Sequence, residues 1–388
     1  MSYNILTLNN ISEKGLSLLP SSEYSVVEQS HHPDAILLRS YNMHEYAIPD
    51  SLKAVGRAGA GVNNIPLDKM SNAGVVVFNA PGANSNAVKE LVIASMLMAC
   101  RNLPAGQDFA KNLQGSDEEI HKQVESGKKN FAGFELPNRT LGVIGLGAIG
   151  VKIANAAKRL GMNVIGFDPL ISIENAWGLD AEVEKAKDLD QVLSESDFIT
   201  FHVPLVEATK DIINAESLDK MKDNVIILNF ARNGIVNDEA VCKGIEMGKV
   251  HSYVCDFPSN LLNSQKGVIA LPHLGASTRE AEENCAIMVA EQVKDYLENG
   301  NIKNSVNFPN IEAPRKGVAR ITILNKNVPD MLGQVSHILG DANVNINQMT
   351  NDSRGELAYT LLDVDSTISQ DIEMALAGIE GVLRLRVL

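Results

Sequence analysis

The sequence TLGVIGLGAIG, residues 140–150, predicts an apolar strand that runs directly into a glycine-rich turn of the form G-x-G-x-x-G. Gly145 permits the tight turn, Gly147 lets the backbone approach a pyrophosphate, and Gly150 lets the next helix pack closely on the strand. The free N–H groups of a helix that starts near Ala148 would face that pyrophosphate. The stretch therefore predicts a dinucleotide site.

An acidic residue follows the next predicted strand. Asp168 ends the apolar run at residues 163–167 and lies 23 residues after Gly145, where its carboxylate can accept both ribose hydroxyls of an adenosine. The same charge would repel a 2′-phosphate, and no arginine follows Asp168. We therefore expect NAD as the cofactor and not NADP.

Length and composition narrow the function classes. A chain of 388 residues exceeds one ordinary core, so we expect two or three domains. The net charge of −14 argues against nucleic acid or an anionic membrane as partner. The first residues lack the layout of a signal peptide, and the longest apolar run, residues 91–100, is about half a membrane span. The four cysteines show no pairing or metal pattern, so we expect reduced thiols, a cytoplasmic protein and no metal.

Short apolar runs alternate with helical patterns in two blocks, before residue 100 and between residues 140 and 273. Such alternation predicts an α/β protein with two doubly wound parallel sheets, and the cleft between them is the expected small-molecule site. A long helix over 275–298 could return to the first block. After a polar stretch with Pro309 and Pro314, the pattern becomes βαββαβ, which is typical of a small ferredoxin-like sandwich.

Two polar residues follow strands of the second block. His273 comes after the run 268–271, and Arg232 comes after the run 225–229. Taken alone, such a histidine is more often structural, and such an arginine more often forms a surface ion pair. Both follow strands at the carboxyl end in a block with a nucleotide fingerprint, which favours a catalytic role for the pair.

The chain resembles the D-isomer-specific 2-hydroxyacid dehydrogenases over nearly its whole length. Residues 55–64 (VGRAGAGVNN) resemble the family's substrate loop, and residues 84–91 resemble its first interface helix. The stretches around Gly145, Arg232 and His273 resemble its nucleotide and catalytic signatures. Within the family, the chain is similar to members that oxidise 3-phospho-D-glycerate with NAD in L-serine biosynthesis.

This resemblance implies roles for individual residues. His273 would be the general acid/base, and Arg232 would bind the substrate carboxylate and carbonyl. The substrate acid would be held by Arg57, Ala58 and Gly59, with Arg39 and Lys129 as further cations for a phosphate, although Lys128-Lys129 could equally be a solvated loop. The residues expected to border NAD are Gly145, Gly147, Ala148, Ile149, Gly150, Asp168, His202, Val203, Pro204, Thr209, Phe230, Ala231, Asp256 and Gly275.

The resemblance also implies a domain organisation. A flavodoxin-like substrate domain would comprise residues 1–97 and 282–305, and a Rossmann NAD domain residues 98–281. Residues 306–316 would form a linker, and residues 317–388 an ACT regulatory domain. Asn325, Asn327 and Asn345 match effector positions for L-serine, but Asp330 stands where a glycine is usual and would repel the effector's carboxylate. Pure dimerisation is the alternative role, and we expect a homodimer or homotetramer.

One feature departs from the family pattern. The usual glutamate that pairs with the histidine is absent, because no acid occurs between Asp256 and His273. Either Asp256 does both jobs, or a carboxylate from elsewhere substitutes. The alternatives to a phosphoglycerate substrate are another D-2-hydroxy acid, such as D-glycerate or D-2-hydroxyglutarate, and a non-enzymatic NAD(H) sensor that binds a protein partner.

Overall fold

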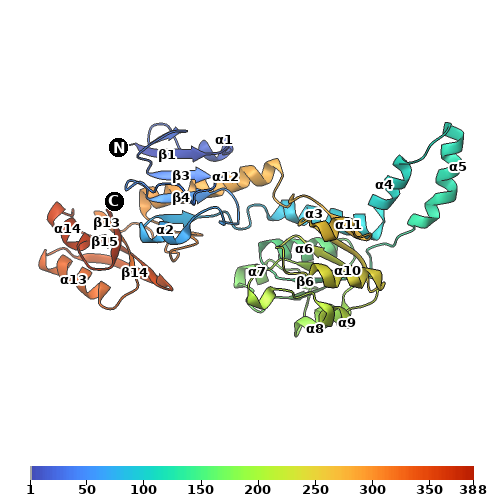
Figure 1. Cartoon of the computed structure of the whole chain (residues 1–388). Helices are drawn as coiled ribbons and strands as arrows, with labels where there is room; N and C mark the ends of the chain where they lie inside the picture. The colour runs from blue at the N-terminus through green and yellow to red at the C-terminus, as the bar shows by residue number, and fades with distance from the viewer. Residues whose placement is uncertain (1) are drawn as a thin grey trace. The chain divides into compact units, whose positions relative to one another are not determined.

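The computed structural model describes residues 2–388 and divides into two compact units (Figure 1). The first comprises the chain up to Asn84 together with Arg279–Leu388, and the second comprises Ser85–Thr278. The sequence-based division lies between residues 97 and 98, whereas the compact units divide between residues 84 and 85. Within residues 2–388, no helix has both the length and the apolar character that a membrane span requires.

The first unit contains a parallel sheet in the order β2-β1-β3-β4-β5. This order places a topological switch point between β1 and β3, where connections leave in opposite directions. The apolar runs predicted four of its strands. The sequence analysis missed β2, because this edge strand is mostly exposed and lacks an apolar run. The strands are β1 (Tyr3–Leu8), β2 (Tyr24–Val27), β3 (Ala35–Leu38), β4 (Ala54–Arg57) and β5 (Val76–Phe78).

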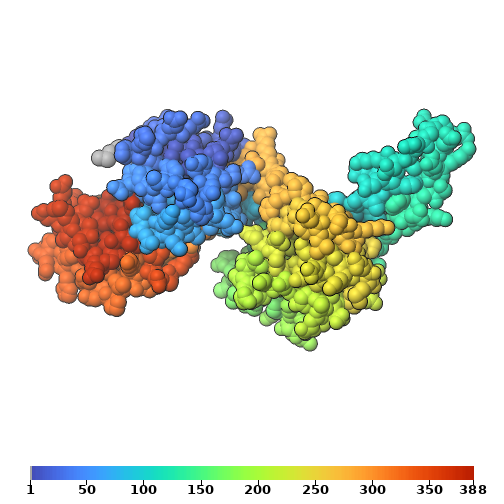
Figure 2. All heavy atoms as spheres, viewed as in Figure 1, coloured from blue at the N-terminus to red at the C-terminus, as the bar shows by residue number. Residues whose placement is uncertain are grey.

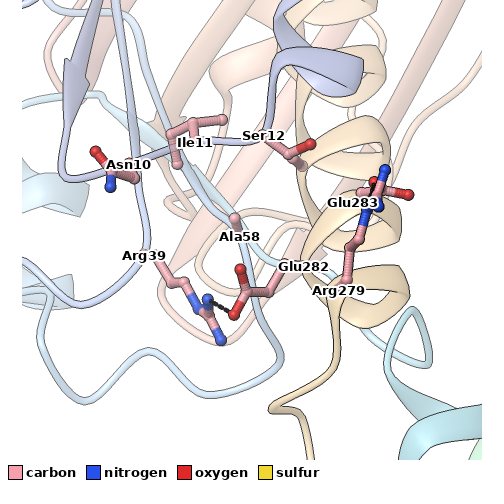
Figure 3. Close-up of a pocket in the computed structure, with 9 residues that line it drawn as sticks. Asn10, Ile11, Ser12, Arg39, Ala58, Arg279, Glu282 and Glu283 are labelled. Carbon is pink, nitrogen blue, oxygen red and sulfur yellow. Dashed lines mark hydrogen bonds and ion pairs between the residues drawn. The ribbon is translucent and has the colours of Figure 1, made fainter.

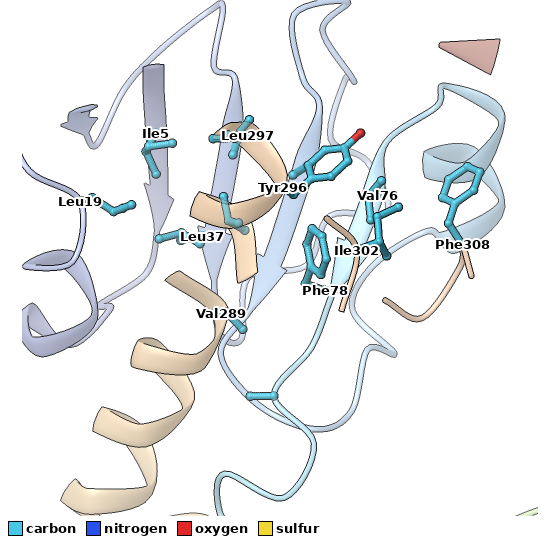
Figure 4. Close-up of a cluster of buried hydrophobic side chains, with 14 of the residues drawn as sticks. Ile5, Leu19, Leu37, Val76, Phe78, Val289, Tyr296, Leu297, Ile302 and Phe308 are labelled. Carbon is cyan, nitrogen blue, oxygen red and sulfur yellow. The ribbon is translucent and has the colours of Figure 1, made fainter. Parts of the chain in front are cut away.

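The long helix α12 (Arg279–Asn299) packs on one face of this sheet beside the short helix α1 (Glu13–Leu16), and the short helix α2 (Leu67–Asn72) packs on the other face. Val289 and Val293 of α12 lie so close to β4 that a Cβ on Gly56 would come within 3.3 Å of both side chains. Figure 4 shows Val289 and Tyr296 facing the buried side chains of the strands. The strand that leads into the predicted substrate loop is therefore supported directly by α12.

The second unit is built on a parallel sheet in the order β12-β11-β10-β9-β6-β7-β8, with its switch point between β6 and β9. Its strands are β6 (Thr140–Ile144), β7 (Asn163–Phe167), β8 (Glu184–Lys185), β9 (Phe198–Phe201), β10 (Val225–Asn229), β11 (Val250–Cys255) and β12 (Val268–Ala270). Its helices are α3 (Ser85–Cys100), α6 (Ala148–Arg159), α7 (Ile173–Trp177), α8 (Leu189–Glu195), α9 (Ala215–Lys220), α10 (Asp238–Glu246) and α11 (Asn260–Ser264), with a 3-10 turn, η2, at Glu207–Thr209. These two sheets confirm the predicted doubly wound α/β class.

An arm leaves the second unit after α3. It comprises α4 (Leu103–Lys111), α5 (Asp117–Gly127) and the 3-10 turn η1 (Lys128–Phe131), and Figure 2 shows it standing clear of the body of its unit. Phe109 and Phe131 pack together with ring centroids 5.1 Å apart, and Gly127 allows their close approach because a Cβ there would lie 2.4 Å from Phe109. The arm therefore has a small apolar contact of its own.

The C-terminal residues form the predicted βαββαβ module. Its antiparallel sheet has the order β14-β15-β13-β16. The elements are β13 (Ala319–Lys326), α13 (Met331–Asp341), β14 (Ile346–Arg354), β15 (Leu357–Val364), α14 (Gln370–Ala377) and β16 (Val382–Val387). Leu324, Tyr359 and Leu361 of its sheet share one buried cluster with Tyr296 and Phe308, so the module packs on the first unit's core.

Polar groups of this module cap the carboxyl end of α12. Arg386 donates to the carbonyls of Tyr296, at 2.9 Å, and Leu297, and Tyr359 donates to the carbonyl of Gly300. Arg320 donates to the Asn299 carbonyl at 2.9 Å. The last carbonyls of a helix lack intrahelical partners and carry a partial negative charge, so the arginines satisfy both needs.

Arg320 also forms a buried ion pair. Its guanidinium binds the Asp363 carboxylate at 2.7 and 2.8 Å, and both side chains are fully buried. We expect Arg320→Met to lower the free energy of unfolding by about 3–5 kcal/mol, because Asp363 would remain buried without its cation. The measurement is urea unfolding of the purified chain. The double variant Arg320→Met/Asp363→Leu should recover part of the loss, and a loss below about 1 kcal/mol in the single variant would contradict the predicted role.

Candidate active site

The glycine-rich turn follows β6 and leads into α6. Gly145 has φ +92°, and a Cβ there would lie 2.6 Å from the carbonyl oxygen of His202. A Cβ on Gly150 would lie 2.0 Å from the Gly145 carbonyl oxygen, whereas one on Gly147 meets no atom within 4 Å. No side chain caps the start of α6, at Ala148 and Ile149. The open space over Gly147 and the uncapped N–H groups fit a pyrophosphate.

Asp168 follows β7 directly and lies beside this turn. One carboxylate oxygen accepts a hydrogen bond from the Leu146 N–H at 2.8 Å, and the other accepts from the Leu170 N–H at 2.9 Å. These bonds hold the carboxylate against the glycine turn. Each oxygen keeps a second lone pair, so Asp168 can accept ribose hydroxyls there.

His202 follows β9, the neighbour of β6 at the switch point. Its Nε2 lies 2.9 Å from the Thr200 hydroxyl, and its Nδ1 is shielded from solvent without a partner. Burial lowers the pKa of His202 to about 3, so the ring is neutral at pH 7. After it come the half-buried Val203 and the exposed Pro204, and the Thr209 hydroxyl donates to the Pro204 carbonyl at 2.6 Å.

Arg232, Asp256 and His273 follow the adjacent strands β10, β11 and β12. Parallel strands end at the same edge of a sheet, so the three side chains lie close together. His273 Nδ1 is 3.8 Å from an Asp256 carboxylate oxygen, and the histidine is mostly exposed while the aspartate is buried. Among residues 2–388, Asp256 is the one carboxylate within 4 Å of His273. The structure therefore brings Asp256 within ion-pair distance of His273.

Asp256 lies in a mixed electrostatic environment. Burial raises its pKa, and the nearby positive charges of His273, when protonated, and Arg232 oppose that rise. Neither carboxylate oxygen has a hydrogen-bond partner within 3.5 Å. The carboxylate is therefore available to a polar group that enters beside His273. Gly275 borders it, because a Cβ on this residue would lie 3.7 Å from the carboxylate.

Two residues of this edge were missed in the sequence. Asn229 ends β10 and is buried; its amide donates to the Arg232 carbonyl at 2.9 Å and accepts from the Ala231 N–H at 3.2 Å. It thereby shapes the turn that contains Phe230, Ala231 and Arg232. Phe257 packs edge-on against His273 with ring centroids 5.3 Å apart. Both residues lie within three positions of a predicted site residue in the sequence, and this closeness could have indicated them.

Four of the predicted substrate residues lie at the ends of β3 and β4 in the first unit: Arg39 follows β3, Arg57 is the last residue of β4, and Ala58 and Gly59 follow it. The Arg57 guanidinium lies against Gly59, where a Cβ would overlap it at 1.7 Å. Arg39 and Ala58 line a cavity of about 220 Å³. Lys129 belongs to η1 of the second unit and is exposed, and Lys128 pairs with Glu125.

The predicted effector residues are only partly brought together. Asn325 and Asn327 line a cavity of about 250 Å³ at the start of α13, but Asn345 is not among its lining residues. Asn325 is buried, and its Oδ1 has no partner. Asp330 also lines the cavity, with φ +65°, and its carboxylate covers Gly333. No cluster of metal-ligating residues occurs within residues 2–388.

Comparisons with known proteins agree with this geometry. Residues 93–275 match the model of the "D-isomer specific 2-hydroxyacid dehydrogenase, NAD binding domain". The chain is 38% identical to a D-3-phosphoglycerate dehydrogenase of Methanocaldococcus jannaschii, covering 81% of this chain and 58% of the relative. It is 31% identical to that of Haemophilus influenzae, covering 87% and 81%. The chain thus spans little more than half of several curated relatives.

A solved structure is similar as well. The NAD+-bound 3-phosphoglycerate dehydrogenase of Entamoeba histolytica is 26% identical, with a TM-score of 0.61, and the match covers 79% of this chain and 99% of the other. Together with the matched family model, this supports NAD as the cofactor.

His202 should make the fold sensitive to acid. Its pKa of about 3 lies below the ordinary value of 6.5, so the unfolded chain binds a proton that the folded chain excludes. We expect the free energy of unfolding to fall as the pH drops from 6.5 toward 3, with up to about 1.4 kcal/mol per pH unit due to this group. The free energy of unfolding, measured by urea titration at pH 7.5, 5.5 and 4.5, should change less with pH in His202→Gln than in the wild type. An equal dependence on pH in the two proteins would contradict the neutral buried ring.

Proposed function

Because the chain belongs to the D-isomer-specific 2-hydroxyacid dehydrogenase family, we propose that it oxidises 3-phospho-D-glycerate to 3-phosphohydroxypyruvate with NAD. This is the first step of L-serine biosynthesis. The observation that carries the proposal is the convergence of Arg232, Asp256 and His273 at one sheet edge, beside β9 and the nucleotide turn. A location in the cytoplasm follows from this role.

His273 is the general base in the oxidation. Its exposed ring takes the proton of the substrate's 2-hydroxyl group as the carbonyl forms, and it returns a proton in the reverse direction. NAD held at the glycine turn and Asp168 would supply the hydride acceptor. Arg232 holds the substrate carboxylate and polarises the forming carbonyl oxygen, because a guanidinium donates two parallel hydrogen bonds to such a group. Arg57 and the backbone of Ala58 and Gly59 hold the acid, as in the family.

Asp256 acts as the partner of His273 in place of the usual glutamate. A carboxylate 3.8 Å from the ring stabilises the protonated imidazole and orients it. Burial keeps the carboxylate from being screened by water. This assignment argues against a non-enzymatic NAD(H) sensor, because the absent glutamate was the main argument for that alternative.

The phosphate of the substrate needs a cation of its own. Arg39 is the cation that supports it, since this residue lines a cavity at the carboxyl ends of β1, β3 and β4. Another D-2-hydroxy acid, such as D-glycerate or D-2-hydroxyglutarate, is the second candidate. The curated relatives named D-3-phosphoglycerate dehydrogenase favour the phosphorylated acid.

The C-terminal module acts as an ACT domain that senses L-serine, and the chain assembles as a homodimer or homotetramer. The buried, unpartnered Oδ1 of Asn325 supports an effector at the 250 Å³ cavity, and the Asp330 carboxylate lowers the affinity for the effector's own carboxylate.

The projecting arm supports self-assembly, because Leu103 at its base is half exposed. Light scattering of the purified chain measures its mass in solution.

The first prediction of this proposal concerns turnover. Purified protein with NAD should form NADH from 3-phospho-D-glycerate faster than from D-lactate, D-glycerate or D-2-hydroxyglutarate, and L-serine should reduce that rate. His273→Ala should lose at least about a hundredfold in kcat, because proton transfer by a side chain contributes that much. Full activity of this variant would show that the mechanism is wrong. Turnover of an unphosphorylated acid alone would move the assignment to the second candidate.

The second prediction concerns Asp256→Asn, which keeps the shape and removes the charge. In the oxidation, the acid limb of the kcat/KM profile should move to lower pH, because no carboxylate stabilises the protonated imidazole. Glu246→Gln is the matched control, since this exposed residue of α10 carries the same charge outside the site. A limb that stays in place would show that Asp256 is not the partner of His273.

A further inference from the structure

The cavity at the switch point of the first unit contains more charge than the proposed function uses. It has a volume of about 220 Å³ and is lined by the segments after β1 and β4, by Arg39 after β3, and by the first two turns of α12, which contribute Arg279, Glu282 and Glu283. Ligands of doubly wound sheets bind at this position, outside the carboxyl ends of the strands.

A carboxylate of the chain already binds the cation of this cavity. Glu282 forms an ion pair with Arg39, and Figure 3 shows the two side chains turned toward each other. The Arg39 side chain is 33% exposed and that of Glu282 is 48% exposed, so the pair lies at the mouth of the cavity and can be opened from solvent.

The neighbouring charges have other partners. Glu283 binds Lys14 at 2.6 Å and Arg279 at 3.0 Å. Cys285 lies one turn further along α12; burial raises the pKa of its thiol, and Arg39 and Arg57 act against that rise. Glu282 is therefore the carboxylate of this cavity that pairs with Arg39.

We propose that Glu282 competes with the phosphate of the substrate for Arg39, and that it is therefore a specificity-determining residue. This inference rests on the proposed function, in which Arg39 binds the phosphate. A phosphate that occupies the cavity must displace the Glu282 carboxylate from the guanidinium. The displaced carboxylate swings into solvent, because nearly half of its surface is already exposed.

The competition lowers the affinity for every anion that uses Arg39. A free guanidinium would also bind inorganic phosphate, whereas the paired guanidinium binds it more weakly. The substrate also binds through its carboxylate, and this additional binding energy helps its phosphate to break the Arg39–Glu282 pair. A small anion with a single contact breaks the pair less readily. An acid without a distal anionic group does not use Arg39 and is unaffected.

The test is Glu282→Gln, which removes the charge and keeps the shape. The KM for 3-phospho-D-glycerate should fall roughly two- to fivefold, the range expected for a partly exposed ion pair, with kcat unchanged. The dissociation constant of inorganic phosphate, measured by calorimetry on the intact chain, should fall by a similar factor. The KM for D-glycerate should stay the same.

Glu280→Gln is the control, because this exposed residue lies two positions away, about 200° around the helix, and outside the cavity. It removes the same charge and should leave both constants within error. An unchanged or raised phosphate dissociation constant in Glu282→Gln would overturn the proposal; a rise would mean that Glu282 positions Arg39 for the ligand.

The calorimetric measurement separates this inference from the proposed function. If the wild-type protein does not oxidise 3-phospho-D-glycerate, the proposed function fails. Tighter phosphate binding by Glu282→Gln then still supports competition at Arg39. If the wild-type protein turns over the phosphorylated acid and the variant shows no tighter binding by either measurement, the inference alone fails.

Discussion

The parallel alignment of neighbouring strands is the constraint on which the rest of this structure depends. Parallel strands run in the same direction, so the residues that follow them all emerge at the same edge of the sheet. In the second unit this edge receives Arg232, Asp256 and His273 from three adjacent strands. In the first unit it receives Arg39 and Ala58 around one cavity. Side chains far apart in the sequence are thereby gathered because the strands that precede them are hydrogen-bonded neighbours.

Helix α12 contacts three parts of the first unit that lie far apart in the sequence: the cavity with Arg39, strand β4 and the C-terminal module. Its early turns supply Glu282 to the cavity with Arg39, and its middle packs on β4 through Val289 and Val293. Its carboxyl end is held by Arg320 and Arg386 of the C-terminal module. Because these arginines satisfy carbonyls that would otherwise be buried without partners, the module is a structural part of the first unit.

The Asp256–His273 and Glu282–Arg39 pairs differ because their carboxylates are exposed to water to different degrees. Asp256 is buried, so its carboxylate is less screened by water than a surface carboxylate would be. Glu282 is half exposed, so its pair with Arg39 is weak enough for an incoming anion to break. A carboxylate beside a cation can therefore support proton transfer in one place and regulate anion binding in another, according to its exposure.

Local sequence determined the elements and the nucleotide turn. The apolar runs and the spacing of Gly145, Gly147 and Gly150 depend on short-range sterics and on the period of a strand, which a sequence displays directly. The βαββαβ order was predicted for the same reason. The edge strand β2 was missed because an exposed strand has no apolar run. Partners distant in the chain were decided by the tertiary structure alone: Asp256 with His273, Glu282 with Arg39, and Arg386 with the end of α12. Those pairings depend on which strands are neighbours and on where helices cross the sheet, and no local pattern records either.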